Sequence, residues 1–391
     1  MSLVWSVTKC RLRYCLNLCN VSEMNIIDRM LRPYPLSLRI LVSISLILGF
    51  TTWTTIGSVS ACTSVYHAPS LIMLKSYDWH DGDGDLYFNP KGMIRSAFPH
   101  ESSTQHSTYS WQSKFSSLTF NQYGRGFPNG GINEKGLVIE VLWLEQSKAV
   151  PIDKRPYLNE LEWVQFALDT QSSVAELIQA SQRLRISPIH GKVHYMTCDA
   201  SGQCATIESL NGRVVIHSHE HLPYPALTNH SYSDSLDYFN TLVNKPKKAK
   251  GSLKRFVVAA QATKQTQKLS LLKALNTLDK VKIEGYTKWQ IAYDLRNKEI
   301  LFRTAYEPSV KSLSLVKLIQ SLKIQEGCSA QYTLSLSSKA TRDLPKYFTT
   351  PKLKIEKSNL SIRFKKLKLS AKLAHHLAEH GARCHDSDSN K

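Results

Sequence analysis

The amino-acid sequence predicts a layered α/β domain in which two antiparallel sheets pack between layers of helices. Three observations lead to this fold class. The 391 residues are 42% hydrophobic and 21% charged, a globular composition long enough for a large core. Strand-like runs are interleaved with amphipathic helical stretches. Asn211-Gly212 and Asn297-Lys298 separate short apolar runs, as hairpin turns between antiparallel strands do.

The predicted elements follow from the period of the apolar residues. Short apolar runs bounded by turn residues predict strands at Ser64–Tyr77, Leu137–Leu144, Val193–Ile207, Arg213–His217, Trp289–Asp294 and Glu299–Ala305. Apolar residues at helical spacing predict helices at Leu158–Ala167, Val174–Ser181, Ser235–Leu242, Leu253–Thr263 and Ser270–Leu278.

The N-terminal segment has the features of a targeting sequence. Residues Ile40–Phe50 form an apolar run that follows a basic flank, and a spanning helix needs about 20 apolar residues, so the run is short for an anchor. Small residues follow and end at Ala61, which suits cleavage after that residue. A buried or membrane-anchoring helix is the alternative. The segment before the basic flank is long for the n-region of a signal peptide, which leaves Met24 or Met30 as alternative starts.

Three segments are therefore expected. Residues 1–61 would be a leader with a signal peptide that is removed, residues 62–327 the main domain, and residues 328–391 a C-terminal extension that packs on it. The end of the extension is polar and is expected to be frayed. The processed protein would be exported, periplasmic or secreted, without stable membrane insertion.

The charge and the ligand-type residues narrow the range of partners. The chain carries +19, and loss of the leader removes six basic and two acidic residues, which leaves about +15. The basic residues are dispersed, with a denser stretch over 352–372, and we find no nucleic-acid recognition motif, so a solvated basic face is expected rather than a nucleic-acid site. No CxxC or Cys/His spacing indicates zinc, and no metal is expected.

Export would place the cysteines in an oxidising compartment. Cleavage after Ala61 leaves five of them, an odd number: Cys62, Cys198, Cys204, Cys328 and Cys384. Cys198 and Cys204 flank a turn between two strand-like runs, and either a cross-hairpin disulfide or two free buried thiols fits this spacing. The unpaired cysteine would then be Cys62.

An N-terminal Cys62 would bring a thiol and an α-amine together in one residue. The amine has a reference pKa of about 7.7–8, so its neutral fraction can accept the thiol proton near neutral pH. A cysteine activated by its own amine is a known route to covalent acyl transfer. Two alternatives stay open. Val59–Cys62 also resembles a bacterial lipobox, in which Cys62 would be lipidated, and Cys62 could be an ordinary strand cysteine.

Several motifs in order indicate a family. From Cys62 to about Tyr306 the chain resembles the choloylglycine hydrolase and penicillin V acylase family of N-terminal-nucleophile (Ntn) hydrolases. The resemblance rests on Ala61-Cys62-Thr63-Ser64, Lys75-Ser76-Tyr77-Asp78-Trp79, Asn133-Glu134-Lys135-Gly136-Leu137, the hairpin from His194-Tyr195 through Asp199-x-Ser201-Gly202 to Ile207-Glu208, Leu227-Thr228-Asn229, and Ser252-Leu253-Lys254-Arg255-Phe256.

The resemblance implies a four-layer αββα sandwich and hydrolysis of a linear amide C–N bond without a cofactor. Cys62 would be the nucleophile, and Asp78 would accept a hydrogen bond from its amine. Asn229 and the backbone N–H of Trp143 would hold the oxyanion, and Arg255 would organise the charge around the nucleophile. From the residues alone, Asp78 would equally fit a turn cap, and Arg255 a helix-surface position.

Two positions depart from the family pattern. Lys75 stands where an arginine is usual, and the two side chains are not equivalent in bidentate bonding. Lys75 is therefore only a possible substrate-binding residue. Trp143 stands where bile-salt enzymes commonly have asparagine and many penicillin acylases tyrosine. Its large apolar ring favours an aromatic or aliphatic acyl group.

The sequence thus predicts an exported cysteine amidase that acts on a small-molecule amide. Penicillin V, a conjugated bile salt and an N-acyl homoserine lactone all remain open as substrates, and a homo-oligomer is compatible with the sequence. The alternative is a catalytically inactive, lipid-anchored exported binding protein of the same fold.

Overall fold

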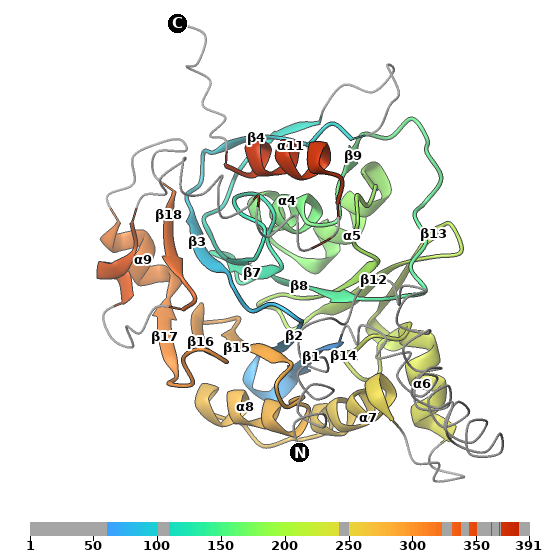
Figure 1. Ribbon diagram of the computed structural model, residues 1–391. Coiled ribbons are helices and arrows are strands. Elements are labelled where there is room, and N and C mark those ends of the chain that lie inside the picture. Colours follow the sequence, from blue (N-terminus) through green and yellow to red (C-terminus); the bar gives the residue numbers. More distant parts are fainter. Residues whose placement is uncertain are drawn as a thin grey trace, which may run out of the picture. The chain divides into compact units, whose positions relative to one another are not determined.

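A computed structural model describes residues 61–100, 109–241, 250–322, 331–337, 344–349, 361, 367 and 369–382 (Figure 1). The expected signal sequence lies outside these residues, as do Cys328 and Cys384.

Two large sheets dominate the described structure, and the neighbouring strands in both run antiparallel. The six-stranded sheet has the order β14 (Ala226–Leu227), β1 (Ala61–His67), β2 (Ile72–Asp78), β15 (Thr287–Asp294), β16 (Glu299–Thr304), β17 (Lys311–Ser314). The eight-stranded sheet has the order β13 (Arg213–Ser218), β12 (Cys204–Leu210), β11 (Val193–Cys198), β8 (Val138–Trp143), β7 (Gly130–Asn133), β6 (Ser117–Asn121), β3 (Asp85–Asn89), β18 (Tyr332–Ser335). Two further pairs are β4 (Ile94–Ser96) with β5 (Ser110–Gln112) and β9 (Tyr157–Leu158) with β10 (Arg185–Ile186).

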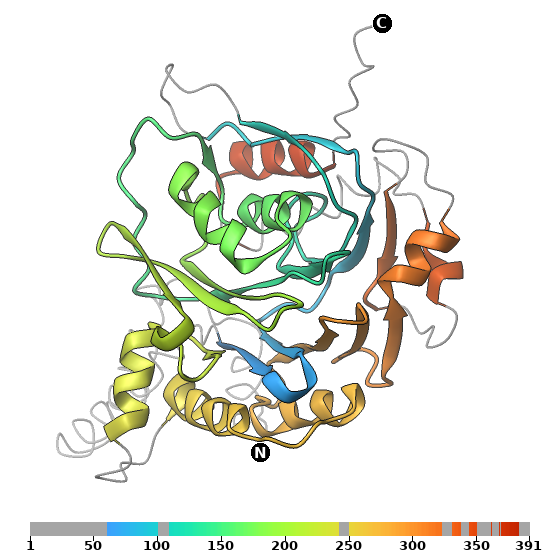
Figure 2. The same cartoon turned by 180° about the vertical axis from the view of Figure 1, so that it is seen from behind.

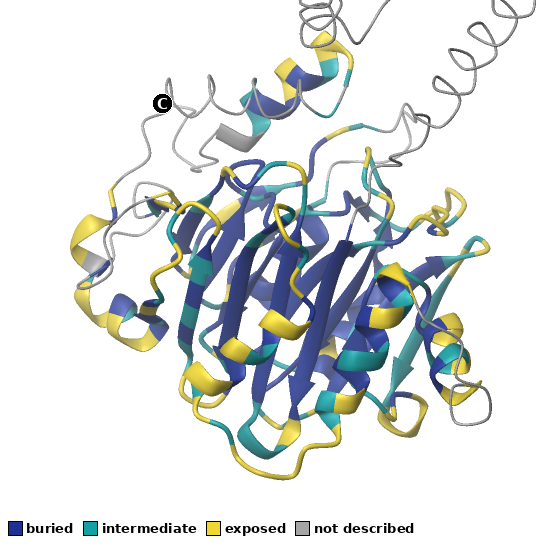
Figure 3. Ribbon diagram, turned by 60° about the horizontal axis from the view of Figure 1, so that its bottom comes forward, coloured by how far each residue is buried: buried dark blue, intermediate teal, exposed yellow. Residues whose placement is uncertain are grey.

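Helices cover the outer face of each sheet (Figures 1 and 2). Those over the six-stranded sheet are α7 (Gly251–Thr263) and α8 (Leu271–Thr277), with α6 (Tyr232–Thr241) against α7. Those over the eight-stranded sheet are α4 (Glu162–Thr170) and α5 (Val174–Arg183). Most of the strands are buried, and the exposed residues lie on the outer sides of the helices and in the loops (Figure 3). This αββα order confirms the predicted fold class.

The turns explain the strand order. Asn211 and Gly212 both have positive φ, 51° and 74°, the pair of angles that a type I′ turn needs between β12 and β13. Between β1 and β2, Pro69 cannot donate to a ladder, so the predicted run Ser64–Tyr77 divides into two strands there. A disulfide joins Cys198 at the end of β11 to Cys204 at the start of β12, so of the two alternatives left open the structure has the bridge.

Residues beyond 310 contribute elements for which the sequence patterns gave no prediction. Strand β18 pairs with β3 at the edge of the eight-stranded sheet. Helix α11 (Ala371–Ala382), red in Figure 1, packs through its apolar side on Phe98, Tyr123 and Phe127. Helix α9 (Leu315–Ser321) follows β17 directly. Within the described ranges, no helix is both long and apolar enough to cross a bilayer.

Candidate active site

Cys62 lies on β1, the second strand of the six-stranded sheet, between β14 and β2, and is 2% exposed. Its backbone N–H donates to Asn229 Oδ1 at 2.7 Å. Its Sγ lies 3.9 Å from the carbonyl oxygen of Asp78 on the neighbouring strand. The strand pairing therefore fixes the thiol, while a residue more than 160 positions away in the sequence holds the nitrogen.

Asp78 ends β2 opposite Ala61. Its Oδ1 accepts from Ser76 Oγ at 2.9 Å and from Thr287 Oγ1 at 2.5 Å. Its Oδ2 is buried and has no hydrogen-bond partner within the described structure. The nearest cation is Arg255, whose Nη1 lies 4.0 Å from Oδ2. A buried acceptor is thus held next to the residue that precedes Cys62 in the chain.

Arg255 reaches the site from the buried side of α7. Its Nη1 donates to the Cys62 carbonyl at 2.5 Å and to Thr63 Oγ1 at 2.8 Å, and its Nη2 donates to Asn229 Oδ1 at 2.9 Å. The side chain is buried, so the helix-surface alternative for this residue is wrong. One guanidinium therefore fixes both the Cys62 backbone and the Asn229 amide next to it.

Asn229 follows the short strand β14, and its orientation is set from both ends. Oδ1 accepts from Cys62 and Arg255, and Nδ2 donates to the Trp143 carbonyl at 2.8 Å. Its backbone N–H donates to Ser252 Oγ at 2.7 Å. Since both acceptor bonds fall on Oδ1, Nδ2 is directed toward Trp143.

The residue before Asn229 is held by a buried network that the sequence analysis did not single out as functional. His194 Nε2 lies 2.7 Å from the Thr228 carbonyl, and His194 Nδ1 lies 2.7 Å from Glu208 Oε1. His194 and Glu208 both belong to the hairpin motif. The sequence feature that could have indicated this network is a His and a Glu at opposite positions of that hairpin, because the strand register pairs His194 directly with Glu208.

Trp143 ends β8 and directs its backbone toward Asn229. Leu144 N–H bonds to Lys192 O, so in an antiparallel ladder the N–H and C=O of Trp143 point away from β11. Strand β7 begins at Gly130, opposite Glu140, and offers no ladder partner to this N–H. The Trp143 N–H and the Asn229 amide thus lie on the same side of β8.

Burial and the neighbouring charges have opposite effects on the pKa of the Cys62 thiol. Burial raises the pKa of Cys62, while the charges of Lys75 and Arg255 act to lower it. Burial likewise raises the pKa of Asp78, against the hydrogen bond from Thr287 and the charge of Arg255. A thiol in such surroundings needs a nearby base to become a nucleophile.

Lys75, the possible substrate-binding residue, lies between the two sheets. Its Nζ donates to the Val141 carbonyl and lies 3.7 Å from Glu140 Oε2. The side chain is fully buried and is not among the residues that line the pocket described next. The structure therefore places Lys75 between the sheets and outside the pocket wall.

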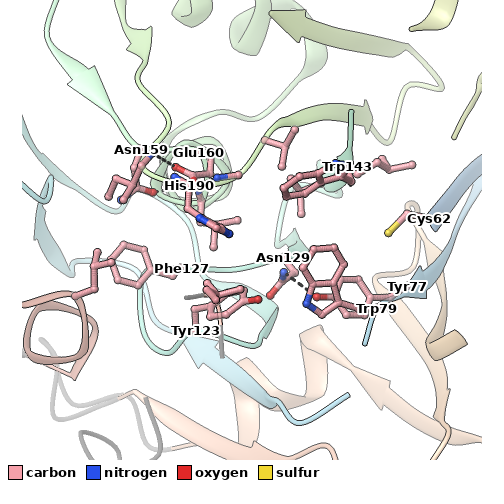
Figure 4. Close-up of a pocket in the computed structure, with 18 of the residues that line it drawn as sticks. Cys62, Tyr77, Trp79, Tyr123, Phe127, Asn129, Trp143, Asn159, Glu160 and His190 are labelled. Atoms are coloured by element: carbon pink, nitrogen blue, oxygen red, sulfur yellow. Dashed lines mark hydrogen bonds between the residues drawn. The ribbon is translucent and has the colours of Figure 1, made fainter. Parts of the chain in front are cut away.

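An apolar pocket opens beside Cys62 and has roughly 770 Å³ of empty space, part of it open to solvent. Figure 4 shows Cys62 at one end and Phe127 at the other. The rings of Trp79 and Trp143 lie 5.7 Å apart between their centres and both line the pocket. The described residues gather no three His, Cys, Asp or Glu side chains that could hold a metal ion. This arrangement can bind an apolar group and present a carbonyl to the thiol.

The αββα sandwich, with Cys62 on an inner strand, is the Ntn-hydrolase fold. Among solved structures, penicillin V acylase from Agrobacterium tumefaciens is similar, with a TM-score of 0.62 and 23% identity over 74% of this chain and 98% of that one. A mutant conjugated bile acid hydrolase from Clostridium perfringens has a TM-score of 0.55 and 14% identity, over 74% and 96% of the two chains. At these identities the likeness concerns the fold.

Sequence comparison names the family. Residues 119–250 match the family described as linear amide C–N hydrolases, choloylglycine hydrolase family. Penicillin V acylase from Pectobacterium atrosepticum is 32% identical over 199 residues, 45% of this chain and 51% of that protein. The chain thus spans about half the length of the curated relative it matches. Over these residues the chain is similar to the choloylglycine hydrolase family, and this similarity confirms the resemblance recognised from the motifs.

Proposed function

We propose that this protein is an exported cysteine amidase that hydrolyses a linear amide through an acyl-enzyme on an N-terminal Cys62. One observation carries the proposal. Asn229 and Arg255 hold Cys62 at the end of an apolar pocket, beside a backbone N–H on Trp143 that no strand of the described structure uses. The match of residues 119–250 to the family model supports the reaction class, because that family is described by linear amide hydrolysis.

The position of Ala61 supports a mechanism that starts with cleavage. Ala61 pairs with Asp78 in the β1–β2 ladder, so its removal frees the space beside the unpartnered Asp78 Oδ2. The Cys62 nitrogen already donates a hydrogen bond to Asn229 Oδ1. After cleavage it would become an α-amine near two acceptors, Asn229 Oδ1 and Asp78 Oδ2. Such an amine is held in place and can act as the base.

The reaction then balances as follows. The α-amine takes the thiol proton, and the sulfur attacks the carbonyl carbon while the carbonyl electrons move to oxygen. Asn229 Nδ2 and the Trp143 N–H stabilise that oxyanion. Collapse breaks the C–N bond, and the leaving amine takes the proton from the α-ammonium. Water then attacks the thioester carbonyl while the same amine takes its proton; the C–S bond breaks, the acid is released, and the departing thiolate of Cys62 takes the proton back from the α-ammonium.

The pocket supports an aromatic or aliphatic acyl group on the substrate. Its wall is mostly aromatic and aliphatic, and two tryptophans flank the nucleophile. Penicillin V, a conjugated bile salt and an N-acyl homoserine lactone each present a carbonyl linked to an apolar group. These three amides form the panel for the test.

The test expresses the full chain with its own leader and measures acid release from the three amides. We expect turnover of at least one, and none by Cys62→Ala, with N-terminal sequencing that starts at a free Cys62. A blocked, lipidated Cys62 without turnover would instead support the inactive binding protein. Turnover by Cys62→Ala would exclude Cys62 as the nucleophile.

A further inference from the structure

We propose that the C-terminal part of the chain builds the end of the acyl pocket and that Leu377 sets the length of the acyl chain the enzyme accepts. We call Leu367, Leu369 and helix α11 the C-terminal wall. The inference rests on the proposed function, because it concerns the substrate of the same site. It assigns the site to amides of uncharged aliphatic acids.

The C-terminal wall supplies three of the side chains that line the pocket: Leu367, Leu369 and Leu377. Leu377 is 4% exposed, although it lies on a helix near the end of the chain. Cys62 lies at one end of the pocket, and Phe127, against which the helix packs, lies at the other (Figure 4). The far end of an acyl group attached to Cys62 would therefore meet this wall.

The wall is fixed to the domain by several independent contacts. Ala374 and Ala378 are 1% and 2% exposed and let α11 approach Phe98 and Phe127 closely. The ring of His380 lies edge-on to Phe98, with ring centres 5.2 Å apart, and its Nε2 lies 3.3 Å from Glu162 Oε1. A helix held in this way can define a length, because shifting it would break buried contacts.

The chemistry of the far end excludes a charged acyl tail. The wall contributes leucine side chains, which cannot compensate a buried charge. The carboxylate of Glu160, a nearby lining residue, already accepts from the backbone N–H groups of Ile189, His190 and Gly191 at 2.8, 3.0 and 2.6 Å. Its negative charge would also repel a carboxylate tail. An uncharged hydrocarbon end fits this surface.

The test uses the full chain and a series of para-nitroanilides with butanoyl, octanoyl and dodecanoyl groups. Leu377→Ala lengthens the pocket and should raise the ratio of kcat/KM for dodecanoyl over butanoyl by on the order of tenfold. Leu377→Trp shortens the pocket and should lower the same ratio by a similar factor. His376→Ala, on the exposed side of the same helix, is the matched control and should leave the ratio unchanged.

An equal change on all chain lengths, or a ratio shift in His376→Ala, would overturn the role of Leu377. If the wild type hydrolyses no anilide, the proposed function is in question, but the wall is not. In that case, tryptophan fluorescence measures the affinities for free butanoic, octanoic and dodecanoic acids. The ratio of the dodecanoic to the butanoic affinity then takes the place of the kcat/KM ratio. If affinity depends on chain length in the same way in the wild type and in the Leu377 variants, the proposed role of Leu377 is rejected, whatever the outcome for the proposed function.

Discussion

Cys62 lies where its thiol is difficult to ionise, because burial raises its pKa more than the neighbouring cations lower it. A base at the same residue removes this difficulty, since the proton moves only within the site. The geometry favours this solution, as the Cys62 nitrogen is held at 2.7 Å from Asn229 Oδ1. The first prediction follows from that nitrogen.

A chain that keeps one residue before Cys62, such as an initiator Met, should bind substrate but turn it over at least about 10²-fold more slowly. The reason is that an amide nitrogen cannot accept the proton. The measurement compares kcat and KM of the extended and processed chains. Full activity of the unprocessed chain would refute the N-terminal mechanism.

Asn229→Ala should lower kcat by roughly 10²–10³, the range for loss of one oxyanion donor, with less change in KM. Kinetics and a melting curve are measured together, with the exposed Asn240→Ala as control. Asn229 also accepts from Arg255, so some loss of stability is expected. If the melting temperature collapses while the folded fraction keeps its specific activity, Asn229 is structural and the assigned site is misplaced.

Trp143→Asn should spare the chemistry, because a backbone N–H serves the oxyanion whatever side chain it carries. Burial of apolar surface is worth about 25 cal/mol per Å², so aromatic and long-chain acyl amides should bind more weakly, mainly through KM. Bile-salt hydrolysis, if present, should hold or rise. KM and kcat on each of the three amides decide the question. An equal fall of kcat on all of them would mean that Trp143 positions the backbone, and no change would place it outside the site.

At the scale of elements, the two sheets are joined by a buried polar contact. Tyr293 on β15 donates to Glu140 Oε1 on β8 at 2.6 Å, and Lys75 on β2 lies 3.7 Å from Oε2 of the same carboxylate. Gly130 is required beside it, because a Cβ there would come within 2.2 Å of Glu140 Oε2. The charge of Lys75 in this contact also acts to lower the pKa of the Cys62 thiol.

Burial raises the pKa of Glu140 from 4.5 to about 7, although Lys75 and Tyr293 act to lower it. The folded protein thus holds this proton more tightly than the unfolded chain does. The resulting stability is present below about 4.5 and is lost as the pH rises through about 7. The wild type should lose up to about 3 kcal/mol of unfolding free energy over this window.

Glu140→Gln should remove that loss, because the amide does not titrate and still accepts from Tyr293. Denaturant unfolding at about pH 5 and about pH 8 measures the difference. Glu145→Gln, whose parent side chain is 70% exposed, is the control and should behave as the wild type. If the Gln variant shows the same decline as the wild type, Glu140 is not the group that titrates.

At the scale of the whole molecule, four strands of each large sheet could be predicted from the sequence, β1, β2, β15 and β16 in one and β8, β11, β12 and β13 in the other, and so could the helices α4 to α8. Their apolar residues repeat at the strand or helix period, and turns such as Asn211-Gly212 carry their own conformational requirement. Elements that form because of tertiary contacts have no such local pattern and were not predicted. β18 is a short edge strand that exists by pairing with β3, and α11 is stabilised by packing on Phe98 and Phe127.

The sequence by itself determined the family resemblance, the fold class and the choice of Cys62, Asp78, Asn229 and Arg255 as candidate site residues, because local motifs carry that information. Only the tertiary structure decided which atoms meet. It makes Asn229 Oδ1 the acceptor for both the Cys62 N–H and Arg255, packs Lys75 between the two sheets, and places Leu377 in the wall of the pocket. The physical reason is that these contacts join residues far apart in the chain, and packing selects them after the local patterns are satisfied.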